Sequence, residues 1–179
     1  MPSRFKISFL FGLIIFFNST SVISQPDPAK ASRMKIQGIY LYSFAKNVYW
    51  PTNYTTGDFT IGIYGSKDFF DQLSANFKDK MTGSQKIIFD FYESTSEISD
   101  CHMLFVCKEE KNTISKVKKV LNEKTLLVTE LTDISNSSSS MINFVYVQSK
   151  LKFQLNKSEA EKNNFKIGQT LTKLAYSTI

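Results

Sequence analysis

The chain has 179 residues, of which 42% are hydrophobic and 21% charged, and its formal net charge is +6. This length suits one domain whose hydrophobic core needs no disulfide bonds for its stability. The single histidine excludes a pair of histidine metal ligands, and the mild positive charge, without an arginine-rich patch, argues against nucleic-acid binding. We expect neither a metal site nor a cofactor.

The N-terminus has the order of features that is typical of a secretory signal peptide. Arg4 and Lys6 form a basic region, residues 7–17 form an apolar run, and residues 22–24 precede an expected cleavage site at Gln25. This apolar run is too short to cross a bilayer, and no cysteine directly follows it to carry a lipid anchor. We therefore expect removal of the signal peptide (residues 1–24) and export without membrane insertion; an uncleaved anchor is the alternative.

A proline-containing lead over residues 25–32, which we expect to be mobile, precedes a predicted helix over residues 34–50. At 100° per residue, one broad stripe of this helix is apolar and is predicted to face the core. The stripe consists of Met34, Gly38, Leu41, Phe44, Ala45 and Val48, with Tyr42 and Tyr49 along its edge. Pro51 is expected to end the helix, because proline disfavours the α conformation of Trp50 before it.

Four apolar residues of the same helix lie outside that stripe, among or beside the polar residues of the opposite side. They are Ile36, Ile39, Tyr40 and Trp50. A helix that is apolar on more than one side is either covered twice within its own domain or offers its second side to a partner. Both explanations remain open. In the second, these four residues form a partner-binding surface, either for a second copy of the chain or for another protein.

Residues 59–128 alternate between strand and helix patterns. Strands are predicted over residues 59–64, 86–92, 103–106 and 126–128, with one helix through Phe69, Leu73 and Phe77 and a second over residues 113–122. The lysines of the second helix alternate with apolar residues at helical spacing, so they are predicted to form its solvated face. Such alternation favours parallel strand pairing with helices on the faces of the sheet.

The pattern changes in the last third of the chain. The elements predicted there are a serine-rich loop (134–140), an antiparallel hairpin (141–147 and 150–155) and two short helices (158–163 and 170–176). Ile167, Leu171 and Leu174 are predicted to point inward. The expected fold is therefore α/β: one domain with a mixed sheet of parallel βα units, a C-terminal β-hairpin and helices on both faces.

The residue pattern contains no catalytic motif. His102 is most simply structural, and Cys101 beside it would point to the opposite face of a strand, which argues against a Cys–His pair. Phosphate-binding glycine motifs are absent from the sequence. The Cα atoms of Cys101 and Cys107 are expected roughly 20 Å apart across an extended segment, beyond the reach of a disulfide. We predict that the protein is not an enzyme and that its two cysteines are not bonded to each other.

A small-ligand sensor domain is the alternative to a partner-binding protein. In α/β proteins, small molecules bind beyond the carboxyl ends of parallel strands. The residues expected at those ends are Gly65, Ser66, Glu93, Ser94, Lys108, Thr129 and Glu130. Each of them also has an ordinary role as a turn or helix-cap residue, so this site remains an alternative.

Several segments resemble, in the same order, the YfiR-like family of bacterial periplasmic proteins. Residues 39–51 are similar to the family's Tyr-x-Tyr-x-Phe-Ala-Lys-x-Val-x-Trp-Pro helix. Further similar segments are residues 59–65, 101–105, 127–129, 141–145 and 151–156. The resemblance spans residues 33–176 and implies one YfiR-like α/β domain over residues 33–179.

The resemblance implies a function as well as a fold. YfiR-like proteins act as periplasmic repressors, and in the characterised case they hold a membrane-bound diguanylate cyclase inactive through its periplasmic domain. By this resemblance the chain is expected to be an exported regulator that binds a membrane signalling protein. Some members carry a redox-sensitive disulfide; Cys101 matches a family cysteine, but no earlier cysteine follows the signal peptide. Ser139 and Ser140 also stand where the family usually has glycines.

Overall fold

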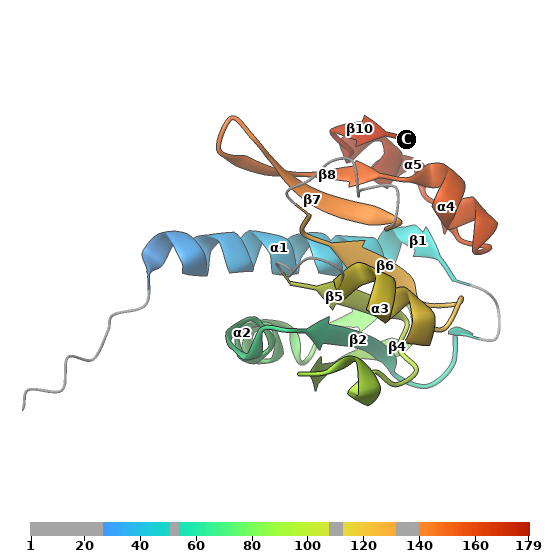
Figure 1. Cartoon of the computed structure of the whole chain (residues 1–179), viewed down its shortest axis with the longest axis horizontal. Helices are drawn as coiled ribbons and strands as arrows, with labels where there is room; N and C mark the ends of the chain where they lie inside the picture. Colours follow the sequence, from blue (N-terminus) through green and yellow to red (C-terminus); the bar gives the residue numbers. More distant parts are fainter. Residues whose placement is uncertain (1–26, 51–53, 108–112, 132–139) are drawn as a thin grey trace, which may run out of the picture.

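The computed structural model describes residues 27–50, 54–107, 113–131 and 140–179, and it shows a mixed sheet with helices on both faces (Figure 1). The signal-peptide prediction lies outside these residues. The helices are α1 (Pro28–Asn47), α2 (Lys67–Phe77), α3 (Thr113–Val120), α4 (Lys157–Lys162) and α5 (Gln169–Leu174), with a 3-10 turn η2 (Thr95–Glu97). The predicted fold class, a single α/β domain with a mixed sheet, is confirmed.

Eight strands of the described residues form the main sheet, in the order β10-β8-β7-β6-β5-β2-β4-β3. They are β2 (Phe59–Tyr64), β3 (Met81–Thr82), β4 (Gln85–Tyr92), β5 (Met103–Val106), β6 (Leu126–Thr129), β7 (Ile142–Val147), β8 (Lys150–Leu155) and β10 (Ser177–Thr178). Strands β4, β2, β5, β6 and β7 pair in parallel, whereas β8 pairs with β7 antiparallel. The predicted parallel units and C-terminal hairpin are both present.

The side chains of the central strands serve two hydrophobic clusters, one on each face of the sheet. On one face, Met103 and Phe105 of β5 join residues of α1, α2, α4 and α5. On the other face, Leu104 and Val106 of the same strand pack with Ile114 of α3. Successive residues of a strand point to opposite faces, so a strand covered on both sides must be apolar throughout. This requirement explains the unbroken apolar run in β5.

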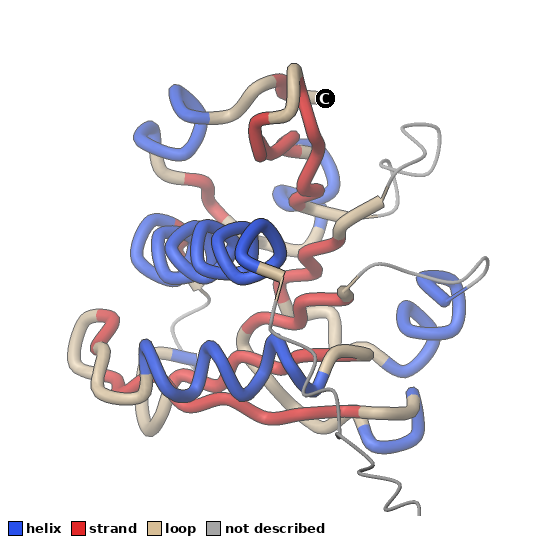
Figure 2. The backbone as a smooth tube through the Cα atoms, turned by 90° about the vertical axis from the view of Figure 1, so that its left-hand side faces the viewer, coloured by secondary structure: helices blue, strands red, loops and turns tan. Residues whose placement is uncertain are grey.

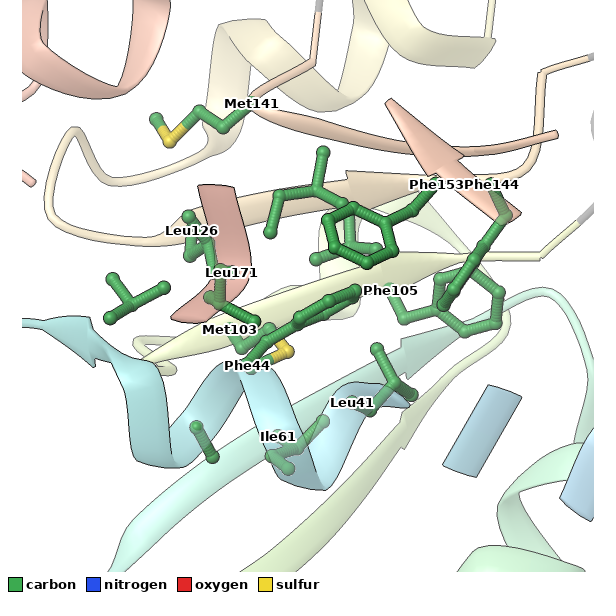
Figure 3. Packing of buried hydrophobic residues seen from close by; sticks show 14 of the residues in the cluster. Leu41, Phe44, Ile61, Met103, Phe105, Leu126, Met141, Phe144, Phe153 and Leu171 are labelled. Atoms are coloured by element: carbon green, nitrogen blue, oxygen red, sulfur yellow. The ribbon is translucent and has the colours of Figure 1, made fainter. Parts of the chain in front are cut away.

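Helix α1 lies in the larger cluster, where it contacts both the parallel strands and the β7–β8 hairpin (Figures 1 and 2). Leu41 and Phe44 are almost fully buried, and the Phe44 ring lies 5.0 Å from that of Phe153 and 5.8 Å from that of Phe144. Figure 3 shows Leu41 and Phe44 pointing from α1 toward Phe105 and the hairpin phenylalanines. The predicted core stripe is confirmed, because all six of its residues are buried.

Helix α2 crosses α1 at Gly38. A Cβ atom on Gly38 would lie 2.7 Å from Cδ2 of Leu73 and 2.8 Å from Cε2 of Phe77, closer than side chains normally approach. The missing side chain therefore lets the two helices pack at short distance. An ion pair between Lys30 and Asp68, 2.7 Å apart, joins the same two helices at their N-terminal ends.

Helix α1 begins earlier than the sequence pattern indicates. It starts at Pro28, where a proline is well tolerated because its missing N–H would have no intrahelical partner. The side chain of Asp27 accepts a hydrogen bond from the amide of Ala29 and caps the helix. Residues 28–32, which were expected to form part of a mobile lead, are therefore helical.

The helix also ends earlier than predicted, at Asn47 rather than at Trp50. Strand β1 (Val48–Tyr49) follows it directly and pairs antiparallel with β9 (Lys166–Ile167). The amide of Gly168 donates to the carbonyl of Asn47, which would otherwise lack a partner at the helix end. The boundary is therefore set by a strand pairing with the distant C-terminal segment, and the prediction that Pro51 ends the helix is wrong.

Leu174 is a second correction. It was predicted to point inward with Ile167 and Leu171, but its exposed fraction is 56%, whereas Leu171 is fully buried. Helix α5 has only six residues, and the chain leaves it directly so that the amide of Tyr176 can donate to the carbonyl of Phe153. Among the described residues, no neighbour covers the last turn of this short helix, so Leu174 faces solvent.

Replacement of Phe44 by alanine is predicted to lower the free energy of unfolding by about 3–5 kcal/mol, because the closely packed cluster cannot collapse into the cavity. Urea denaturation of the protein measures this loss. Ile39→Ser on the same helix is the control, and its effect is expected to stay within about 0.5 kcal/mol because the Ile39 side chain is exposed. Equal losses in the two variants would show that Ile39 is part of the core.

Candidate functional site

Two large apolar side chains of α1 face solvent. The exposed fractions of Ile36 and Ile39 are 42% and 52%, and the helical period places the exposed Lys35 and Lys46 on the same side. These four residues are called the outer face of α1. Figure 2 shows α1 end-on, and no described helix or strand covers the side of it that points away from the sheet. Ile36 and Ile39 are therefore the accessible part of the predicted partner-binding surface.

Tyr40, which was predicted as part of that surface, is half-buried and packs against the hairpin. Its ring lies 5.4 Å from that of Phe153 and 5.8 Å from that of Phe144. Both phenylalanines come from strands more than 100 residues farther along the chain. The helical period alone could not show that the hairpin covers this position.

Trp50, the fourth predicted residue, is also half-buried and lies away from the outer face. Its ring packs edge-on against Phe59 at 4.9 Å and against Phe165 at 5.9 Å. Its indole N–H donates to the backbone carbonyl of His102 at 3.1 Å. The structure therefore brings Ile36 and Ile39 together on the surface, and it places Tyr40 and Trp50 against the core.

His102, the single histidine, is buried directly before β5. The amide of Thr60 donates to its Nδ1 at 3.1 Å, so this nitrogen carries no proton. Its Nε2 lies 3.0 Å from the carbonyl oxygen of Tyr54 and is therefore the donor. The ring also stacks on Phe59, with centroids 4.5 Å apart. Only the neutral imidazole with its proton on Nε2 satisfies both hydrogen bonds.

The surroundings of His102 favour that neutral form. Burial lowers the pKa of His102, and only the hydrogen bond to the Tyr54 carbonyl acts in the opposite direction. The side-chain amide of Gln85 donates to the carbonyls of Tyr54 and Thr56, at 3.2 and 3.3 Å. His102 and Gln85 thus hold the segment 54–57 against the sheet, which is a structural role.

The two cysteines are free, and β5 lies between them. The prediction that Cys101 and Cys107 are not bonded to each other is therefore confirmed. Burial raises the pKa of Cys101 to about 12, and burial together with the nearby Glu130 carboxylate raises the pKa of Cys107. Neither thiol is a thiolate at neutral pH, so neither is a ready nucleophile.

Two strands that end side by side carry the first residues of the predicted ligand site. Gly65 follows β2 with a φ of +85°, and its amide donates to the carbonyl of Tyr92. Ser66 caps α2, since its side chain accepts a hydrogen bond from the amide of Phe69. Glu93 follows β4 and is exposed. Gly65 and Ser66 thus serve the turn between β2 and α2.

Thr129 is the last residue of β6, which β5 separates from β2, and Glu130 follows it. Thr129 is buried, and its hydroxyl lies 2.8 Å from both Ser140 Oγ and Asn143 Oδ1. Glu130 accepts a hydrogen bond from the Tyr146 hydroxyl at 3.2 Å. Ser94 follows Glu93 after β4. The six predicted residues that the structure describes therefore belong to two places on this edge of the sheet, and the seventh, Lys108, lies outside the described residues.

Glu130 and Tyr146 form a polar cluster with Arg33 of α1. Burial and the Glu130 carboxylate raise the pKa of Tyr146, and the Arg33 guanidinium partly offsets that rise. The cluster joins the end of β6, the outer part of β7 and the first half of α1. The sequence pattern could not reveal it, because it depends on how the hairpin sits relative to α1.

A cavity of about 160 Å³ lies between α3 and α4. Its polar walls bond to each other: Lys118 pairs with Glu159 at 3.0 Å, and the Asn163 side chain donates to the carbonyl of Glu159. Within the ranges that the structure describes, no group of three or more His, Cys, Asp or Glu side chains could hold a metal ion. None of the helices in those ranges is long and apolar enough to cross a bilayer.

Comparison with known proteins gives one informative match. A family model described as YfiR/HmsC-like matches residues 34–176. None of the curated proteins matches the chain. Among solved structures, the ABC domain in complex with L-Trp from Streptococcus pneumonia is similar at 15% identity and a TM-score of 0.42, over 67% of this chain and 55% of that one. The chain thus spans about half the length of that structure, and a likeness this weak carries no argument.

The free energy of unfolding is predicted to fall as the pH drops from about 6.5 to 5, by at most about 1.4 kcal/mol per pH unit, the slope for one proton. The unfolded chain binds this proton near pH 6.5, whereas folded His102 stays neutral because burial lowers its pKa. The contribution of neutral His102 to the free energy of unfolding is therefore complete above about pH 6.5 and is lost as the pH falls below it. Urea denaturation at several pH values, with His102→Gln as the non-titrating control, measures the effect; equal slopes in both proteins would contradict it.

Proposed function

This chain belongs to the YfiR/HmsC-like family, and from that premise we propose that it is an exported periplasmic regulator that acts by binding. Members of the family regulate diguanylate cyclases in the periplasm. In this proposal, residues 1–24 are a cleaved signal peptide and the partner is the periplasmic domain of a membrane-bound signalling enzyme, whose activity the protein restrains.

The observation that carries the proposal is the outer face of α1. The family match begins at Met34 and so includes the part of this helix that carries Ile36 and Ile39. The helix is held in place by its buried stripe, yet Ile36 and Ile39 are exposed side by side. Polar residues would be expected at these positions if they faced only solvent. A rigid helix with an apolar outer side is a common means of protein recognition.

A binding role also agrees with the chemistry of the titratable groups. Both thiols have raised pKa values, and His102 is held neutral by two hydrogen bonds inside the fold. Family members are regulators rather than enzymes, and we propose the same for this protein. A second copy of the chain is a further candidate partner.

A small-ligand sensor is the second candidate function. The cluster of Glu130, Tyr146 and Arg33 favours it, because a carboxylate, a phenol and a guanidinium meet at the carboxyl edge of the sheet. Such a sensor would use this cluster rather than Gly65, Ser66 and Glu93, which lie at the other end of that edge. The two functions are compatible in one protein if a ligand modulates partner binding.

The proposed function is tested by measuring cyclic di-GMP in cells of the native host. Deletion of the gene is expected to raise the cyclic di-GMP level several-fold, and expression of the full chain is expected to lower it again to the original level. A variant that lacks residues 1–24 is the control: it should fail to restore the level, because it stays in the wrong compartment. An unchanged level after deletion would contradict the proposal.

A further inference from the structure

Charge is unevenly distributed over the fold. Helix α1 contains Lys30, Arg33, Lys35 and Lys46 and no acidic residue. Residues 141–179 contain six lysines and two glutamates, whereas residues 58–100 contain eight acidic residues and four lysines. In Figure 1, α1 and the C-terminal elements occupy one half of the molecule, and α2, β2 and β4 occupy the other. Helix α1 and the C-terminal elements are therefore basic, whereas the segment that contains α2, β2 and β4 is acidic.

The two lysines of the outer face of α1 flank its two isoleucines. Lys35 and Lys46 are 11 positions apart in the sequence, which corresponds to about 16 Å along a helix. Lys30, on another side of the helix, is neutralised by Asp68. Neither Lys35 nor Lys46 has an ion pair in the described part of the chain; Lys46 instead lies 5.5 Å from the ring centre of Tyr42.

We propose that the outer face of α1 docks an acidic, amphipathic segment of the partner. Apolar side chains of that segment cover Ile36 and Ile39, and its carboxylates lie against Lys35 and Lys46. This inference rests on the proposed function, and it adds which surface makes the contact and what chemistry the partner must present. Complementary charge around an apolar centre sets the register and speeds association.

The same charges disfavour a second copy of the chain as the occupant. In a two-fold contact between two outer faces, each copy presents the same residues. The apolar side chains can then pack together, but positive charge meets positive charge. When the two helices lie antiparallel over their isoleucines, each copy brings the same positive lysines, Lys35 and Lys46, to the contact. No carboxylate of α1 offsets this repulsion. An acidic partner instead places carboxylates against these lysines, so the repulsion does not arise.

The outer face is also too small for a membrane surface. Stable insertion of an interfacial helix needs a broad apolar face with large residues along its whole length. Of the large apolar residues of the 20-residue helix α1, only Ile36 and Ile39 are exposed, at 42% and 52%. Anionic lipid could attract the lysines, but it would gain little from the isoleucines.

Four variants separate these contacts from general charge effects. Lys35→Glu with Lys46→Glu reverses the charge of the outer face, and Ile39→Ser removes an apolar anchor. The matched controls lie on α3, on the other face of the sheet: Lys116→Glu with Lys119→Glu makes the same change in net charge, and Val120→Ser replaces a residue that is 50% exposed. All four changes are at exposed positions, so circular dichroism should show folded proteins.

The experiment measures binding of each protein, by titration calorimetry, to the purified periplasmic domain of a membrane diguanylate cyclase from the same organism. The two α1 variants are expected to weaken binding about tenfold or more, since buried anchors and complementary charges dominate such contacts, and the α3 controls should bind as the wild type does. Raising the salt concentration should weaken wild-type binding but have little effect on the Lys35→Glu/Lys46→Glu variant.

Other outcomes would overturn the inference in distinct ways. Unchanged binding by both α1 variants would place the docking surface elsewhere and leave the proposed function standing. Equal losses from the α1 and α3 charge reversals would show only long-range attraction. If wild-type protein does not bind, the proposed function fails. If sedimentation shows a wild-type dimer that Ile39→Ser dissociates, the occupant of the outer face is a second copy of the chain. If the protein binds phosphatidylglycerol vesicles and only the α1 variants lose that binding, the occupant is lipid.

Discussion

The packing of Phe44 between Phe144 and Phe153 is the contact on which the rest of the structure depends. It joins a helix from the N-terminal end of the described chain to a hairpin that forms near the C-terminal end, and Leu41 beside it extends the contact to the parallel strands. Burial of large aromatic side chains contributes much of the stability of a domain of this size. Because this packing fixes the inner side of α1, it also determines which residues remain outside.

The C-terminal end of α1 is held by a second set of contacts. The β1–β9 pairing and the bond from Gly168 to Asn47 hold the chain as it leaves the helix, and Trp50 is bonded to the carbonyl of His102. A Cβ atom on Gly168 would lie 2.6 Å from the Asn47 carbonyl oxygen, so this approach requires glycine. The outer face therefore lies on a helix that is anchored along its length and at its end. Binding a partner would order little additional backbone, so it would cost little conformational entropy.

The sequence predicted the fold and the inner stripe of α1 well, because both depend on local periodicity. Strands β2, β5 and β8 have the predicted bounds, since each is an apolar or alternating run between clear turn residues. Contacts between distant segments were not predictable in this way. The end of α1 depends on β9, and the cover over Tyr40 depends on the hairpin, so a search for period and propensity could not find either.

The candidate site shows the same division. Ile36 and Ile39 were identified because they interrupt the polar side of α1, which is a local signal. Of the cluster of Glu130, Tyr146 and Arg33, only Glu130 was predicted, from its place after a strand. Tyr146 and Arg33 left no such signal, since they come from two other elements and are polar residues of ordinary kinds. Leu174 was assigned to the core by its spacing from Leu171, but it is the last residue of a six-residue helix and lies exposed where the chain turns away.

The central claim is that one helix serves the core with one side and the partner with the other. Photo-cross-linking from position 39 in living cells tests it most directly: a benzoyl-phenylalanine that replaces Ile39 reacts with whatever touches the outer face. We predict a cross-link to a membrane signalling protein through an acidic segment of its periplasmic domain, and none from the same probe at Val120 of α3. A cross-link from position 120 but not from position 39, or a product that contains only two copies of this chain, would contradict the account.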